Sequence, residues 1–160
     1  GNYPYTINPG GPNHEELVSL IGIYEYFDNL YHHHFENKET SIRKKISKVN
    51  ELITAHEAII ANPLLDYLNN NNDFNLIGKN KINNKNRAPT ISFTHKVKNS
   101  KDISKVLVSE GIGTRNDNFY AWRCLKGLGI STKDGVVRLS MVHYNNNEEI
   151  NKIINALDKI

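Results

Sequence analysis

The chain has 160 residues, a length that suits one compact domain with a hydrophobic core. Hydrophobic residues make up 38% of the sequence, and no apolar run approaches the roughly 18 residues that a membrane span needs. The net charge is +3, but lysine and arginine are scattered among acidic residues, which argues against nucleic-acid binding. The single cysteine, Cys124, excludes an internal disulfide and a multi-cysteine zinc site, so we expect a cytoplasmic protein.

The first part of the sequence predicts an extended arm and two long helices. Residues 1–12 hold three prolines and three glycines and predict an arm that ends in a Gly-rich turn. Asn13 and Glu16 have the spacing of a helix N-cap and its N3 residue, and apolar residues recur at helical spacing over 14–34. A second helix is predicted over 40–61, with Pro63 ending or kinking it. The expected buried stripe of the first helix is Leu17, Leu20, Ile21, Tyr24, Phe27, Leu30 and Tyr31.

The rest of the chain predicts the order β-β-α-β-α-β-α. Strands are expected at 74–78, 90–97, 112–115 and 136–142, and helices at 100–111, 120–128 and 148–159. We expect Ser100 to cap the first of these helices and Asn145 or Asn146 to cap the last. This order predicts one domain over 13–160, an α/β two-layer sandwich with helices on one face of a small sheet.

Arg138 is the most informative residue of the last predicted strand. Alternation places it on the face opposite Val137, Leu139 and Met141, which are expected in the core. An unpaired buried guanidinium costs several kcal/mol, so Arg138 either reaches solvent or meets an anion. Arginine binds a carboxylate through two parallel hydrogen bonds, which makes a carboxylate site the functional interpretation.

Other candidate residues give weaker signals. Gly10 and Gly11 precede a helix and form either an ordinary turn or a backbone site for phosphate at the helix N-terminus. Residues 32–34 are consecutive histidines, whose side chains diverge on a helix, so no metal site is predicted. His56 is expected to be a satisfied core residue, and Cys124 an incidental or buried thiol because no base lies near it in the sequence.

Three segments together resemble the C-terminal part of class V aminotransferase-like enzymes, which depend on pyridoxal 5'-phosphate (PLP) and include cysteine desulfurases and isopenicillin N epimerase. They are NPGGPNHEELVSLIGIYEYF, then APTISFT with GIGTRNDNFYAWRCLKGLGI, and finally GVVRLSMVHYNNNEEINKIINAL. The resemblance implies the small C-terminal domain of PLP-dependent transferases of fold type I, an α+β domain with a mostly antiparallel sheet covered by helices.

The resemblance also implies roles for single residues. Arg138 corresponds to the arginine that binds the α-carboxylate of the amino-acid substrate. Gly10 and Gly11 correspond to a turn that reaches the PLP phosphate of the partner subunit in a homodimer. Arg115 and Asn118 fall in the loop that lines the substrate entrance.

Tyr120 extends this set of substrate-binding candidates and marks a departure from the desulfurases. In those enzymes a nucleophilic cysteine lies five residues after the arginine that corresponds to Arg115, and here that position is Tyr120. Cys124 lies one helical turn later. Persulfide chemistry is therefore not expected of this sequence.

The resemblance also implies what the chain does not carry. No lysine has the sequence context of the family's Schiff-base lysine, so no catalytic residue is predicted. We expect PLP in an intact enzyme, whose N-terminal large domain belongs to the same polypeptide, and none bound to this chain alone. The substrate amino acid and the reaction remain open among transamination, elimination, racemisation and desulfuration. An alternative is a stand-alone binding or dimerisation module with the same fold.

Overall fold

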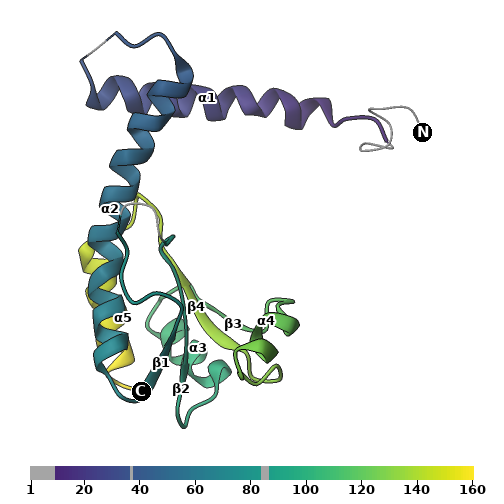
Figure 1. The fold of residues 1–160 in the computed structure, drawn as a ribbon, viewed down its shortest axis with the longest axis vertical. Coiled ribbons are helices and arrows are strands. Elements are labelled where there is room, and N and C mark those ends of the chain that lie inside the picture. Colours follow the sequence, from purple (N-terminus) through teal and green to yellow (C-terminus); the bar gives the residue numbers. More distant parts are fainter. Residues whose placement is uncertain (1–9, 37, 84–86) are drawn as a thin grey trace. The chain divides into compact units, whose positions relative to one another are not determined.

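The computed structural model describes residues 10–36, 38–83 and 87–160 (Figure 1). The chain divides into two compact units, Gly1–Leu52 and Ile53–Ile160, with the boundary inside one long helix. The expected single domain over 13–160 stays a prediction. Most of the expected arm, residues 1–9, lies outside the described residues.

The first unit contains helix α1, His14–His34, with the predicted bounds. The Asn13 side chain accepts a hydrogen bond from the Glu16 backbone N–H at 3.0 Å, as expected of an N-cap. Glu15 and Glu16 lie in the first turn, where their negative charges complement the helix dipole.

The predicted buried stripe of α1 is wrong for its first four residues, which are exposed, whereas Phe27 and Leu30 are half-buried and Tyr31 is buried. Among the described residues of the helix, Tyr31 is the one that is buried. Leu17 and Leu20 of this stripe are 52% and 56% exposed, and Val18, on another side of the helix, is 63% exposed. The periodicity correctly predicted a helix, but burial also needs a surface that covers it.

Helix α2, Ile42–Asn70, is longer than the predicted helix over 40–61 and passes through Pro63. Proline lacks the N–H that would bond to the preceding turn, so it costs stability inside a helix. In α2 this cost is offset because Leu64, Leu65 and Leu68, which follow the proline, are almost completely buried. The expected end of the helix at residue 61 is therefore wrong, because tertiary burial outweighs the local penalty.

The second unit contains a four-stranded antiparallel sheet with the order β1-β2-β4-β3. The strands are β1 Phe74–Ile77, β2 Thr90–His95, β3 Arg115–Asp117 and β4 Val136–Ser140. The antiparallel sheet of the predicted fold class is confirmed, but β3 begins later than the expected 112–115. Ile112 belongs instead to the end of the preceding helix, where its backbone N–H bonds to the carbonyl of Leu107 at 2.9 Å.

Three further helices complete this unit: α3 Ser100–Ser109, α4 Trp122–Gly127 and α5 Asn147–Leu157. Asn99, and not Ser100, caps α3, whereas Asn146 caps α5 in a capping box with Glu149. Figure 1 shows α5 running beside α2. One hydrophobic core joins α2, α3 and α5 to one face of the sheet and includes Ile60, Leu64, Leu68, Ile91, Phe93, Ile103, Leu107, Val137, Leu139, Ile150, Ile153 and Leu157.

Candidate functional site

The site is built on the face of the sheet that the core leaves uncovered. The register aligns Ser92 of β2, Arg138 of β4 and Arg115 of β3 in one row across the sheet. Val137 and Leu139, on either side of Arg138, are 0% and 2% exposed and face the core, so Arg138 points to the opposite face. The predicted alternation of β4 is confirmed, and Arg138 is half-buried.

Arg115 and Arg138 carry two positive charges at directly paired positions. Neither guanidinium takes part in an ion pair with another described residue. Like charges directly opposite each other in an antiparallel pair are destabilising. Two guanidinium groups without an acidic partner therefore form a site whose chemistry favours an anion such as a carboxylate.

An aromatic ring lies against Arg138. The guanidinium carbon of Arg138 is 4.1 Å from the ring centroid of Phe119, within the range of a cation–π contact. The Thr114 hydroxyl donates a hydrogen bond to the backbone carbonyl of Arg138 at 3.0 Å, which ties the start of β3 to β4. The arginine is thus held at its backbone and at its side chain.

Phe119 belongs to a tight loop with unusual backbone geometry. Asp117, Phe119 and Tyr120 have φ values of 120°, 52° and 60°, in a region that residues other than glycine rarely adopt. The Asn118 side chain holds this loop, since its oxygen accepts from the Tyr120 backbone N–H at 3.0 Å. Its amide nitrogen donates to the carbonyl of Thr132 at 3.4 Å.

Gly135, the residue before β4, lies directly against the same loop. It has a φ of +69°, and a Cβ at this position would lie 2.1 Å from the carbonyl carbon of Asp117. No larger residue fits there without moving the backbone, so the close approach of residues 117–118 to β4 requires glycine. Gly135 therefore helps to fix the loop that carries Phe119.

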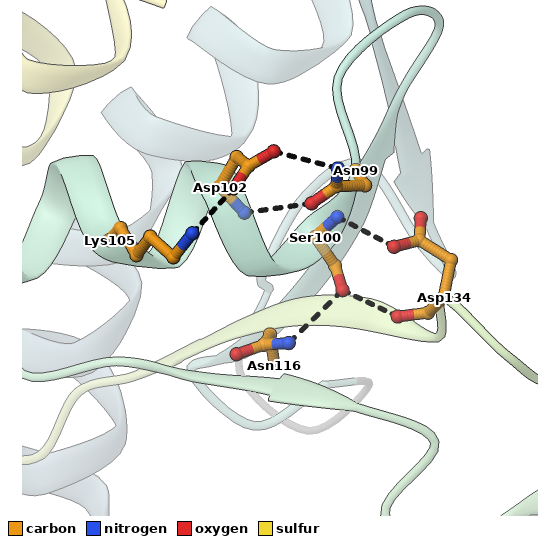
Figure 2. A network of polar contacts seen from close by, with 6 residues as sticks. All are labelled: Asn99, Ser100, Asp102, Lys105, Asn116 and Asp134. Carbon is orange, nitrogen blue, oxygen red and sulfur yellow. Dashed lines mark hydrogen bonds and ion pairs between the residues drawn. The ribbon is translucent and has the colours of Figure 1, made fainter.

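A polar network connects the first turn of α3 to this region (Figure 2). Ser100 is buried; its backbone N–H bonds to the Asp134 carboxylate at 2.8 Å and its hydroxyl donates to the Asp134 carbonyl. The Asn116 side chain of β3 donates to the Ser100 hydroxyl at 3.3 Å. The segment before β4, strand β3 and helix α3 are thereby held together beneath the loop.

The same turn of α3 contains a charged cluster at the surface (Figure 2). Asp102 accepts hydrogen bonds from the Lys105 ammonium at 2.9 Å and from the Asn99 amide at 2.7 Å. These contacts hold the pKa of the Asp102 carboxyl below its usual range, with Lys105 making the larger contribution. The cluster secures the start of α3 and presents no free acid to a ligand.

The structure places the remaining predicted site residues as follows. Tyr120 is 96% exposed, and Asn118 is half-buried with its amide engaged in the loop. Gly10 and Gly11 are exposed just before α1, with no atom within 4 Å of a Cβ built at either position. This turn belongs to the first unit, whereas Arg115, Arg138, Asn118 and Tyr120 belong to the second.

Other candidate features are separate from this site. Cys124 is exposed, and the half-buried His56 makes a hydrogen bond with the carbonyl of Asn145 at 2.9 Å. Within the described residues, no group of three or more His, Cys, Asp or Glu side chains could hold a metal ion. None of the helices searched in the described ranges is both long and apolar enough to cross a membrane. A pocket of about 500 Å³ lies beside β1 and the 128–135 segment, and neither Arg115 nor Arg138 lines it.

Comparison with known protein families shows which family the chain belongs to. The sequence profile described as "Aminotransferase class-V" matches residues 49–153. The chain belongs to the class V aminotransferase family. The matched segment includes the whole sheet with Arg115, Phe119 and Arg138, and it excludes the glycine turn and α1.

Relatives within the class V aminotransferase family include proteins with different descriptions. An aminotransferase-like protein of Gibberella zeae is 31% identical over 111 residues, which is 69% of this chain and 28% of that protein. A probable cysteine desulfurase of Pseudomonas putida is 28% identical over 107 residues, 67% of this chain and 24% of the relative. The chain thus matches about a quarter of the length of each relative.

Solved structures with the same fold include the cysteine desulfurase CsdA of Escherichia coli, with a TM-score of 0.66 and 19% identity. That likeness covers 99% of this chain and 33% of the other. The apo cysteine desulfurase of Thermococcus onnurineus has a TM-score of 0.60 and 22% identity over 74% of this chain and 29% of the other. These similarities confirm the fold of the class V family for this chain.

Sequence reasoning missed three contacts that shape the site. Phe119 was noticed only as part of a motif, because its contact with Arg138 depends on a left-handed backbone at 119. The Asp134–Gly135 pair is a common turn signal, which could have indicated the close approach to Asp117. Ser100 looked like a helix cap, and nothing in its own segment indicates the contact with Asp134.

Proposed function

We propose that the chain is the C-terminal part of a PLP-dependent enzyme of the class V aminotransferase family that acts on an amino acid. Arg138 binds the α-carboxylate of the substrate, and Arg115, Asn118 and Tyr120 line the entrance to it. The observation that carries this proposal is the pair Arg115 and Arg138, which lie side by side without an acidic partner among the described residues. An in-plane fork of N–H donors suits a carboxylate.

The residues present fit one part of a PLP site. Gly10 and Gly11 are exposed, and no described atom lies within 4 Å of a Cβ built at either position, which supports room for a phosphate ahead of α1. PLP, when bound, stabilises negative charge that develops on the substrate amino acid. The proposal includes a homodimer in which this turn reaches the phosphate in the partner subunit, and a cytoplasmic location.

The lysine that holds PLP lies, in this proposal, in an N-terminal large domain of the same polypeptide. The lengths of the relatives support this, because this chain matches 28% and 24% of them. Lys45, the buried lysine of the described residues, has its ammonium bound to the Asp28 carboxylate. The exposed apolar side chains of α1 also support a missing partner domain, since large apolar side chains clustered on a helix are normally covered.

The test uses the longer polypeptide that contains this chain and its Arg138→Lys variant. Lysine keeps the charge but loses the two-pronged hydrogen bond, so KM for the amino acid should rise about 10-fold or more while the PLP content stays unchanged. Arg123→Lys, an exposed position on α4, serves as the control. An unchanged KM for every amino acid that the enzyme processes would refute the role of Arg138.

A second measurement tests whether the lysine that binds PLP lies outside residues 1–160. The isolated 160-residue chain is mixed with PLP, reduced with borohydride and analysed by mass spectrometry. We expect no stoichiometric adduct at any single lysine, whereas the longer polypeptide should acquire one outside residues 1–160. A specific adduct on this chain would contradict the assignment of the lysine to another domain.

A further inference from the structure

The contact between Phe119 and Arg138 does not serve the hydrophobic core. The core cluster of the described residues includes phenylalanines 74 and 93 but not Phe119. Phe119 is half-buried, and its ring meets the guanidinium carbon of Arg138 at 4.1 Å from the centroid. A ring at this distance attracts the guanidinium and shields the side that is turned toward it, while N–H donors that point away from the ring stay available.

The loop holds Phe119 in this place at a conformational cost. Phe119 and Tyr120 both have positive φ values, 52° and 60°, although neither is glycine. Such geometry persists where the surroundings enforce it. Here the enforcing contacts are the Asn118 side chain, the hydrogen bond from the Ala121 N–H to the Asn118 carbonyl at 2.8 Å, and the close approach of Gly135 to Asp117.

The positive charge of Arg115 suggests why the ring of Phe119 lies against Arg138. Arg115 lies directly opposite Arg138, so repulsion between the two guanidinium groups favours arrangements in which they diverge. Carboxylate binding needs the opposite, a guanidinium held in one orientation with its edge free. The ring of Phe119 supplies an attractive contact that opposes this divergence.

We propose that Phe119 is a positioning residue for Arg138: its ring holds the guanidinium so that a carboxylate is bound at the edge, in the plane of the group. The inference rests on the proposed role of Arg138 as the carboxylate-binding residue. It adds a specificity element to that site, because the ring blocks one face and restricts the direction from which an anion approaches.

The experiment uses the 160-residue chain with ¹⁵N-labelled arginine, and acetate is the carboxylate probe at constant ionic strength set with chloride. NMR follows the Nε–Hε signal of Arg138, for which we expect an upfield shift from the ring current of Phe119. Phe119→Asn removes the ring and suits the left-handed backbone, and Phe119→Tyr keeps the ring. Trp122→Leu, at an exposed aromatic on α4, is the matched control.

We expect Phe119→Asn to abolish the upfield shift and to weaken acetate binding at Arg138 by about two- to fivefold, the range of an exposed to half-buried cation–π contact. Phe119→Tyr and Trp122→Leu should retain both the shift and the affinity. Equal acetate affinity in Phe119→Asn and the parent chain would overturn the inference. If Phe119→Asn unfolds, Phe119→Leu replaces it under the same criteria; loss of folding in both would assign Phe119 to the stability of the loop and likewise overturn it.

The failure of the underlying function gives a different result. If acetate leaves the Arg138 signal of the parent chain unchanged while the upfield shift is present, Arg138 does not bind carboxylates and the proposed function fails. In that case the ring of Phe119 still contacts Arg138, but the contact does not prepare the arginine for carboxylate binding.

Discussion

Arg115 lies directly opposite Arg138 across the β3–β4 ladder, and both side chains project from the same face of the sheet. The repulsion between them leads to a prediction that separates stability from binding. Arg115→Gln should raise the free energy of unfolding by about 0.2–1 kcal/mol, because like charges at paired positions are destabilising. The gain should be larger at low salt, where screening is weak. Urea unfolding at two salt concentrations measures it.

Arg123→Gln is the control for this effect, since Arg123 is exposed on α4 and outside the ladder. Its free energy of unfolding should change by less than about 0.5 kcal/mol, as for most surface substitutions. If Arg115→Gln destabilises the chain at low salt, the two guanidinium groups do not repel each other in the folded protein.

Gly135→Ala should strongly destabilise the second unit. A Cβ at this position would lie 2.1 Å from the Asp117 carbonyl carbon, and the φ of +69° is unfavourable for alanine. Overpacking and the backbone term together amount to about 2–5 kcal/mol. Gly129→Ala is the matched control, with a φ of +72° but no atom within 4 Å. It should lose about 1–2 kcal/mol, so equal losses would show that the close approach is unimportant.

The Ser100 hydroxyl provides a test of the network beneath the loop. Ser100→Ala removes a buried group that donates to the Asp134 carbonyl and accepts from Asn116, so we expect a loss of about 1–3 kcal/mol. Backbone amides of residues 114–120 should exchange faster with solvent. Ser109→Ala, which removes an exposed hydroxyl on the same helix, should cost less than about 0.5 kcal/mol. Unchanged exchange at 114–120 would separate the network from the loop.

Local signals predicted the regular elements of the fold well. Asn13 and Asn146 were identifiable as helix caps because capping depends on residues a few positions apart. The alternation in β4 placed Arg138 opposite the core because strand geometry has a period of two. These features need no knowledge of distant contacts, and the candidate arginine followed from them.

Features that depend on distant parts of the chain were not predictable. Pro63 lies inside α2 because the leucines after it are buried by other elements of the second unit. The left-handed backbone at Phe119 depends in part on contacts with residues 132 and 135. The apolar pattern of α1 predicts burial, but the covering surface is not among the described residues. In each case the deciding energy comes from tertiary contacts.

Tyr67 predicts an alkaline loss of stability. Burial, and secondarily the hydrogen bond from its hydroxyl to the Asp158 carboxylate at 2.8 Å, raises the pKa of Tyr67 to about 12. The folded state therefore disfavours the phenolate more than the unfolded state, whose pKa is near 10. The resulting stability is fully present below pH 10 and is lost as the pH rises from 10 to about 12.

The measurement compares the parent chain with Tyr67→Phe by urea unfolding between pH 8 and 11.5. The stability advantage of the parent should be constant up to about pH 9.5 and then fall by about 1–2 kcal/mol, after a discount for partial exposure to solvent. Asp158→Asn should reduce the decline, because it removes the negative charge beside the phenol. An advantage that does not change with pH would refute the raised pKa.

The exposed apolar surface of α1 predicts self-association of the isolated chain. Leu20 and Ile23 are 56% and 54% exposed, and large exposed apolar patches promote contacts between molecules. Leu20→Glu with Ile23→Glu should keep the helix, since glutamate is a good helix former, and should lower the average mass in sedimentation velocity at high concentration. Ser19→Glu with Asn29→Glu adds the same charge at exposed polar positions of α1 and should still associate. A parent chain that stays monomeric at all concentrations would contradict the prediction, because α1 would then need no covering surface.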